Sequence, residues 1–235
     1  MYKNKTFLAI IPARGGSKRL PRKNVLDLVG KPLIAWSIES ALKSKYIDEV
    51  MVSTDDNEIE TIAKRHSANV PYKRASELSN DVVGKEVVIE DVINYYAKNL
   101  NKNFDYIIYL QPTSPLRTSE DIDNSIEFLF EKNADAIVSV CEVEHPVQWS
   151  GTLDENMDMS QFLDADGFKY RSQDLEKYYR LNGSIFLSDT KRFLEEKSMF
   201  LKSNIFAFEM SQEKSVDIDT ELDFKIAKVL IEDVL

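Results

Sequence analysis

The sequence predicts an α/β fold in which one mainly parallel, doubly wound sheet carries helices on both faces. Short apolar runs alternate with amphipathic runs from residue 7 to about residue 140, as expected of strands joined by crossover helices. The composition, with 43% hydrophobic and 30% charged residues, is that of an ordinary globular domain. A length of 235 residues fits one such domain with an insertion and requires no second domain.

The elements of the first half follow from the spacing of apolar residues. Phe7–Pro12 is a short continuous apolar run, which indicates a strand buried on both faces. Leu33–Lys43 carries apolar residues at three- and four-residue spacing, the stripe of an amphipathic helix. The same criteria predict, in order, a strand at Val50–Ser53, a helix at Glu58–His66, a short strand at Val70–Lys73, a helix at Val87–Leu100 and a strand at Tyr106–Leu110.

The second half contains a region without periodicity. It follows a helix that runs to Lys132 and begins with a capping box, in which Thr118 stands three residues before Asp121. From about residue 142 to 180 the chain is polar and studded with aromatic residues, and we interpret this segment as an insertion into a single domain of residues 1–235. The other predicted elements are strands at Ala136–Val140, Ser184–Ser188 and Ile205–Glu209, a helix at Lys191–Glu196 and a helix after Thr220.

The charge and the cysteine content exclude several classes of function. A net charge of −10 argues against general affinity for nucleic acid or anionic lipid surfaces. No apolar stretch approaches the roughly 20 residues that a membrane helix needs, and the N-terminus lacks a signal-peptide core, so we expect a cytoplasmic protein. The single cysteine, Cys141, rules out a disulfide framework and a cysteine-based metal site.

One segment is strongly basic in this acidic chain. From Arg14 to Lys31 there are six basic residues and one acidic residue, which indicates an anion site, although a solvated charge run is the alternative. Gly15 and Gly16 would let backbone amides approach an anion closely. The spacing matches neither the G-x-x-x-x-G-K-[ST] loop nor the G-x-G-x-x-G turn. A triphosphate attacked at its α-phosphorus fits better, because the departing pyrophosphate needs several cations.

Two aspartates near the C-terminus predict a metal site. Asp217 and Asp219 are two residues apart in a predicted strand, so both carboxylates would point the same way. Like charges on one face repel each other unless a cation lies between them, and Mg²⁺ commonly joins one or two carboxylates to substrate phosphates. The alternative is that Asp219 caps the last helix.

Four segments in order carry a resemblance to a known family. The segments are residues 13–24 (ARGGSKRLPRKN), 110–118 (LQPTSPLRT), 180–186 (RLNGSIF) and 216–223 (VDIDTELD). Over about residues 7 to 230 the chain resembles the acylneuraminate cytidylyltransferases, or CMP-sialic acid synthetases. The resemblance implies a Rossmann-like nucleotidyltransferase fold and the transfer of CMP from CTP to N-acetylneuraminate, with release of pyrophosphate.

The resemblance also implies roles for residues that would contact the nucleotide. Arg14 and Lys23 would contact the CTP phosphates, with Lys23 stabilising charge at the α-phosphate. Asn24 would touch the nucleotide. Arg74 would lie near the cytosine, whose O2 and N3 atoms are acceptors. For Arg74 the alternative is a surface charge that follows a strand.

Further residues are implied for the sugar acid. Gln111, Thr113 and Ser114 would face it from the end of a strand, and Arg180 with Asn182 would close over it. Arg180, Gln111 and Asn182 are the predicted ligands of its carboxylate. Arg117, in the same turn, would contact either the ligand or an acidic residue of the next helix.

The family's insertion reaches a partner subunit, so we expect a homodimer, with a small local aromatic cluster as the alternative. Gln148 and Trp149 stand where a lysine is usual, and Ser172 replaces an arginine. The expected substrates are CTP and a nine-carbon 2-keto-3-deoxy sugar acid, with Mg²⁺ as cofactor and N-acetylneuraminate as the first expectation. The alternatives are legionaminate or pseudaminate, 3-deoxy-octulosonate, and a nucleotide-binding module without catalysis.

Overall fold

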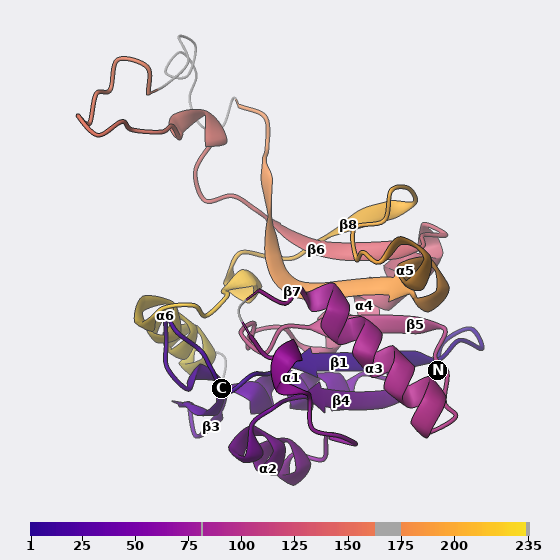
Figure 1. The fold of residues 1–235 in the computed structure, drawn as a ribbon. Coiled ribbons are helices and arrows are strands. Elements are labelled where there is room, and N and C mark those ends of the chain that lie inside the picture. The colour runs from indigo at the N-terminus through magenta and orange to yellow at the C-terminus, as the bar shows by residue number, and fades with distance from the viewer. Residues whose placement is uncertain (81, 163–174, 234–235) are drawn as a thin grey trace.

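A computed structural model describes residues 1–235 except 81, 163–174 and 234–235. Its centre is a six-stranded sheet in the order β4-β1-β5-β7-β6-β8 (Figure 1). The strands are β4 (Glu49–Ser53), β1 (Phe7–Pro12), β5 (Tyr106–Leu110), β7 (Tyr179–Asp189), β6 (Ala136–Glu142) and β8 (Ile205–Glu209). β7 runs antiparallel to β5 and β6, and the other neighbours pair in parallel. The predicted mainly parallel α/β class is therefore confirmed.

Helices cover both faces of this sheet, as the doubly wound arrangement requires. The helices are α1 (Leu33–Lys43), α2 (Asn57–Arg65), α3 (Lys85–Asn99), α4 (Ser119–Glu131), α5 (Thr190–Glu196) and α6 (Glu221–Glu232). Ala9 and Ile11 of β1 pack with α1, α2 and α4 in one core cluster, whereas Leu8 and Ile10 pack with α3 and α5 in another. Because both faces are buried, the sequence of β1 reads as a continuous apolar run.

Several predicted elements are confirmed to the residue. They are the strands at Phe7–Pro12, Tyr106–Leu110 and Ile205–Glu209 and the helix at Leu33–Lys43. The capping box at Thr118 is also confirmed. These segments combine an uninterrupted pattern of apolar residues with clear start or stop signals. Their local preference for a helix or a strand therefore agrees with the tertiary packing.

Three sequence predictions are wrong. Val70–Lys73 is not a strand, since the isolated bridge between Met51 and Asn69 ends just before it and Pro71 has no amide hydrogen to donate. The segment of Asp217 and Asp219 is extended but not a strand. The predicted strand Ser184–Ser188 is only part of β7, whose N-terminal half is too polar to be recognised as a strand.

Residues 143–162 and 175–178, which we call the arm, extend away from the sheet beyond β6 and β7 (Figure 1). Its described part contains one 3-10 turn, η3 (Val147–Trp149). Exposed apolar side chains lie along it, among them Val147, Leu153 and Met157. A partner subunit that covers them stays a prediction. Within the described chain, no helix is long and apolar enough to cross a bilayer.

Candidate active site

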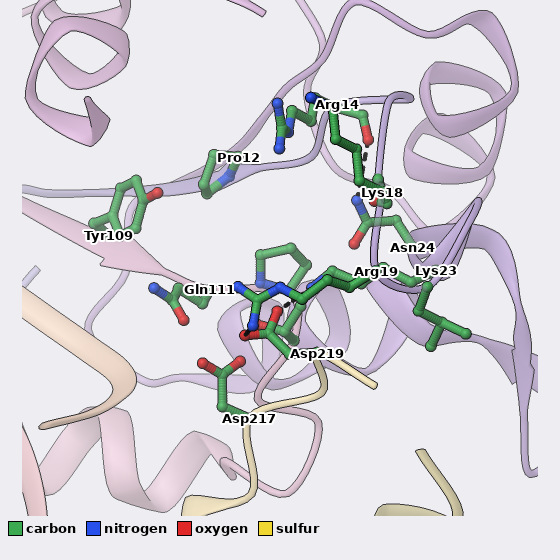
Figure 2. A pocket seen from close by; sticks show the side chains of 14 residues that line it. Pro12, Arg14, Lys18, Arg19, Lys23, Asn24, Tyr109, Gln111, Asp217 and Asp219 are labelled. Atoms are coloured by element: carbon green, nitrogen blue, oxygen red, sulfur yellow. Dashed lines mark hydrogen bonds and ion pairs between the residues drawn. The ribbon is translucent and has the colours of Figure 1, made fainter. Parts of the chain in front are cut away.

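The main cavity lies beyond the carboxyl ends of β1 and β5, where ligands bind in open α/β sheets (Figure 2). Its volume is about 550 Å³. The lining residues come from the loop after β1, the end of β5 and the segment before α6: Pro12, Arg14, Ser17, Lys18, Arg19, Leu20, Lys23, Asn24, Tyr109, Gln111, Pro112, Thr113, Asp217 and Asp219. Four cations thus stand around two carboxylates, a composition suited to phosphates and a divalent cation.

A smaller cavity of about 240 Å³ adjoins the main one and shares Pro12, Arg14 and Tyr109 with it. Its other lining residues are Arg74, Leu78, Asn80, Val83, Lys85 and Val88. The described residues that line it include three cations and no acidic side chain. The two cavities are therefore neighbours on either side of these shared residues, the larger about 550 Å³ and the smaller of a size that suits a single ring.

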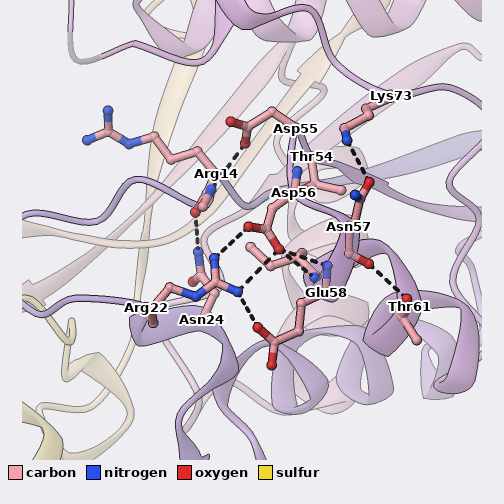
Figure 3. Close-up of polar contacts among 12 residues, drawn as sticks. Arg14, Arg22, Asn24, Thr54, Asp55, Asp56, Asn57, Glu58, Thr61 and Lys73 are labelled. Carbon is pink, nitrogen blue, oxygen red and sulfur yellow. Dashed lines mark hydrogen bonds and ion pairs between the residues drawn. The ribbon is translucent and has the colours of Figure 1, made fainter.

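The loop of residues 13–24 is shaped by two aspartates that follow β4 (Figure 3). The Gly15 amide donates to Asp55 Oδ1 at 3.1 Å. A Cβ at Gly15 would lie 2.6 Å from Asp56 Oδ2, so only glycine fits without a shift. Asn24 closes the loop by donating from Nδ2 to the Arg14 carbonyl at 3.3 Å.

Arg22 anchors the same loop and does not line either cavity. Its guanidinium donates to Asp56 at 2.5 and 3.3 Å and also contacts Glu58 (Figure 3). The hydrogen bond from Arg22 holds the pKa of Asp56 below its usual value. Because Asp56 also caps α2, the loop is fixed to the N-terminus of that helix. Not all basic residues of this segment therefore serve an anion site.

Lys23 and Arg19 contact Asp219 across the main cavity (Figure 2). Lys23 Nζ lies 2.9 Å from Asp219 Oδ1 and 2.8 Å from the Ile218 carbonyl, and Arg19 lies 3.0 Å from Asp219 Oδ2. The residue that caps α6 is Thr220, in a capping box with Asp223. The alternative that Asp219 caps this helix is therefore wrong.

Asp217 lies beside this pair in a different environment. Its Oδ1 is buried and has no hydrogen-bond partner among the described residues, while Thr113 provides a side-chain hydrogen bond. Burial raises the pKa of Asp217, and the neighbouring Asp219 carboxylate raises it further. An unpaired buried carboxylate oxygen is costly unless a ligand or cation satisfies it.

The two aspartates fit Mg²⁺, which takes oxygen ligands and often completes its shell with substrate phosphates and water. In the part of the chain that is described, no cluster of three or more histidine, cysteine, aspartate or glutamate side chains forms a closed metal site. An open site with two carboxylates is what a metal shared with a nucleotide requires.

The residues predicted to face the sugar acid divide into two groups. Gln111 and Thr113 line the main cavity, but Ser114 and Asn182 do not. Ser114 is completely buried. Asn182 is 1% exposed, donates to Ser215 Oγ at 2.9 Å and accepts from Ser139 Oγ at 2.6 Å. The side chains of both residues face the interior of this protomer, and their ligand roles stay predictions.

The three arginines outside the loop also lie differently from one another. Arg180 pairs with Glu144 at 2.9 Å and does not line either cavity. Arg74 is buried, and its Nε donates to Ser79 Oγ at 3.0 Å, so the alternative of a surface charge is wrong. Arg117 makes no hydrogen bond to an acid of the next helix within the described chain; it is buried and donates to two backbone carbonyls, those of Gln111 at 3.2 Å and Ser184 at 2.8 Å.

The residues at which this sequence differs from the family pattern either lie outside both cavities or are not among the described residues. Gln148 and Trp149 belong to η3 in the arm. Ser172 lies outside the described residues, as do two of the aromatic residues of the insertion, Phe168 and Tyr170.

Sequence reasoning missed Tyr109, Lys85 and Gly183. Tyr109 is the residue before the last in β5, and strand position alone could have identified it. Gly183 has φ +72°, and a Cβ there would lie 2.4 Å from Gln111 Oε1, so this glycine makes room for the Gln111 side chain. No local signal connects Lys85 with the cavity.

The fold and the site define a nucleotidyltransferase. The family model described as Cytidylyltransferase matches residues 8–234, and the chain belongs to this family of enzymes. Among solved structures, CMP:2-keto-3-deoxy-manno-octonic acid synthetase in complex with CTP superposes with a TM-score of 0.71 at 21% identity, covering 98% of this chain and 100% of the other. At this identity the likeness shows the fold.

Relatives of known activity are more similar in sequence. The pseudaminic acid cytidylyltransferase of Campylobacter jejuni serotype O:2 is 38% identical over 223 residues, 95% of each chain. The CMP-N,N'-diacetyllegionaminic acid synthase of Legionella pneumophila is 36% identical over 234 residues, 96% of each chain. The N-acylneuraminate cytidylyltransferase of Streptococcus agalactiae serotype V is 38% identical over 220 residues, 92% of this chain but 51% of that protein.

The environment of Asp217 predicts opposite effects on activity and stability. Burial disfavours the ionised form of Asp217 in the folded state and so raises its pKa. The folded protein therefore binds this proton more tightly than the unfolded chain does. As a result, the free energy of unfolding increases as pH falls through the folded pKa. At neutral pH, Asp217→Asn should raise Tm by about 2–4 °C, the shift that about 1 kcal/mol gives in a chain of this size. The same variant should lower turnover by about 10²-fold or more.

Asp219→Asn is the matched control, and calorimetry without metal is the measurement. This variant should lose turnover as well but should lower Tm, because Asp219 is paired with Lys23 and Arg19. A lower Tm for Asp217→Asn would contradict the assignment of Asp217 as an unsatisfied carboxylate.

Proposed function

We propose that this cytidylyltransferase transfers CMP from CTP to the anomeric hydroxyl of a nonulosonic acid and releases pyrophosphate. The observation that carries the proposal is the main cavity, in which Arg14, Lys18, Arg19 and Lys23 face the Asp217–Asp219 pair. The cations match the charge of a triphosphate, and the carboxylates match a divalent cation. A module without catalysis would have no need for a carboxylate oxygen that is buried without a partner, as Asp217 Oδ1 is among the described residues.

The reaction follows from these positions. The acceptor oxygen loses its proton and bonds to the α-phosphorus, while the bond from this phosphorus to the β-phosphate oxygen breaks. Mg²⁺ held by Asp217 and Asp219 would supply positive charge next to the phosphate oxygens. Lys23 would leave Asp219 for the α-phosphate, and Arg14, Lys18 and Arg19 would neutralise the departing pyrophosphate.

Lys23 is held in place before the substrate binds. Its ammonium donates both to Asp219 and to the Ile218 carbonyl, so its position is defined by two acceptors from one short segment. If Asp219 held a metal, the Lys23 ammonium would exchange the carboxylate for a phosphate oxygen of the substrate. Such an exchange needs little reorganisation, which favours stabilisation of the transition state.

For the acceptor, we propose a nonulosonic acid of the pseudaminic or legionaminic type, ahead of the N-acetylneuraminate that the sequence led us to expect. Support comes from the relatives of matching length, which are named for these two acids. The N-acylneuraminate relative is about twice as long as the matched region. Gln111 and Thr113 are the polar groups of the cavity wall available to the acceptor.

An assay of pyrophosphate release with Mg²⁺ tests the proposal. Nucleotides CTP, UTP, ATP and GTP are combined with pseudaminate, N,N'-diacetyllegionaminate, N-acetylneuraminate and 3-deoxy-octulosonate, and products are identified by mass. We expect CTP to be preferred by about 10²-fold, a nine-carbon acid to be preferred, and chelation to abolish turnover reversibly. Equal turnover of a purine nucleotide, or undiminished turnover with chelator, would contradict the proposal.

Replacing Lys23 tests whether this residue stabilises the transition state or only binds a phosphate of CTP in the ground state. Lys23→Ala should lower kcat more than it raises KM for CTP, because its contact strengthens as charge develops at the transferring phosphorus. Arg22→Ala is the comparison: Arg22 holds the loop from outside the cavity, so its loss should act mainly on KM for CTP. A change in Lys23→Ala confined to KM would make Lys23 a ground-state phosphate ligand.

The exposed apolar residues of the arm lead us to propose a homodimer. Light scattering should give about twice the monomer mass of 27.0 kDa at micromolar concentration. Leu153→Asp with Met157→Asp should shift the protein toward the monomer, because both side chains are exposed in the protomer. Leu222→Asp, at an equally exposed site on α6, should not. A monomeric wild-type protein would refute the dimer.

A further inference from the structure

Lys85, the first residue of α3, lines the smaller cavity and is not accounted for by the reaction described above. Its Nζ lies 3.6 Å from the centroid of the Phe186 ring and 4.9 Å from that of Phe200. Within the described chain, no hydrogen bond or ion pair is formed by this ammonium, and burial lowers its pKa. The aromatic rings hold the cation in place while leaving its donors available.

The cavity around Lys85 offers donors and few acceptors. Arg74 and Arg14 line it as well, and the described lining contains no acidic side chain. Its volume of about 240 Å³ suits a single ring, and it shares Pro12, Arg14 and Tyr109 with the larger cavity. A nucleotide with its phosphates beside Lys23 and Asp219 would therefore extend its base toward Lys85.

We propose that Lys85 is a specificity-determining residue that donates a hydrogen bond to N3 of cytosine, while Arg74 donates to O2. This inference rests on the proposed function and names the group that selects its base. In cytosine both O2 and N3 are acceptors, whereas N3 of uracil carries a hydrogen. Two protein donors at this edge therefore both find an acceptor on cytosine. With uracil, one of the two protein donors would face the N3–H donor of the base.

The position of the ammonium makes this contact effective. A lysine already half-buried over an aromatic ring has lost part of its hydration in the folded protein, so binding a base requires little further desolvation. Arg74 is held by Ser79 and lies 4.0 Å from Asp55, which itself accepts from Gly15. The base-side donors and the phosphate loop are thus parts of one preformed site.

The test compares Lys85→Met, which keeps an unbranched chain over Phe186, with Lys85→Arg, which keeps a cationic donor. Lys73→Met is the matched control, because Lys73 is exposed, bonds to Asn57 and does not line either cavity. Binding of CTP and UTP is measured by calorimetry without acceptor, and kcat/KM is measured for both nucleotides. Melting temperatures establish that each variant is folded.

Lys85→Met should weaken CTP binding and lower kcat/KM for CTP by roughly 10- to 100-fold, with little effect on UTP, so that the preference for CTP narrows. KM for the acceptor should not change, Lys85→Arg should restore part of the preference, and Lys73→Met should behave as wild type. An unchanged ratio of CTP to UTP would overturn the proposal. A rise confined to the acceptor's KM would assign Lys85 to the acceptor instead.

The outcomes separate this inference from the proposed function. If wild-type protein turned over no nonulosonic acid, the proposed reaction would fail, yet calorimetry with CTP and UTP would still test Lys85. If the reaction held and Lys85→Met kept full discrimination, only the role of Lys85 would fail.

Discussion

Repulsion among like charges is the constraint on which the site depends. Four cations line the main cavity and a fifth, Arg22, stands in the same loop of residues 13–24, so without compensation this loop would be driven apart. Carboxylates from two other segments hold it together. Asp55 and Asp56, at the end of β4, fix the Gly15 amide and Arg22, while Asp219 accepts contacts from Lys23 and Arg19. The cationic cavity exists because these acids surround it.

These carboxylates differ in whether the proposed reaction would require them to give up the cations that they contact. The contact of Arg22 with Asp56 lies outside the cavity and also belongs to the cap of α2, so nothing in the reaction needs to break it. Asp219 lies inside the cavity, paired with Lys23 and Arg19. In the reaction that we propose, phosphates would compete for these cations and a metal would compete for the carboxylate, so these ion pairs would be exchanged for contacts with the substrate.

The antiparallel strand β7 supports the acceptor side of the site. Gly183 gives room to the Gln111 side chain, and Asn182 ties β6 to Ser215, two residues before Asp217. Arg117 draws the end of β5 toward β7 through two carbonyls, and burial lowers its pKa to about 9. Asn182 and Arg117 thus connect neighbouring strands through interior hydrogen bonds, whereas Ser114 Oγ is buried without a partner among the described residues.

Sequence patterns were enough to predict the fold class, most elements and the family. Continuous apolar runs and capping boxes such as that at Thr118 act locally, so their meaning does not depend on distant residues. The polar residues that face the cavity could not be predicted in this way, because packing selects them. Ser114 and Thr113 are neighbours with similar chemistry, yet packing turns one inward and lets the other hold Asp217. Lys85 reaches the smaller cavity from α3, which is far in sequence from the loop of residues 13–24. Segments distant in sequence form the cavity together, and no local pattern in one segment indicates which others it will contact.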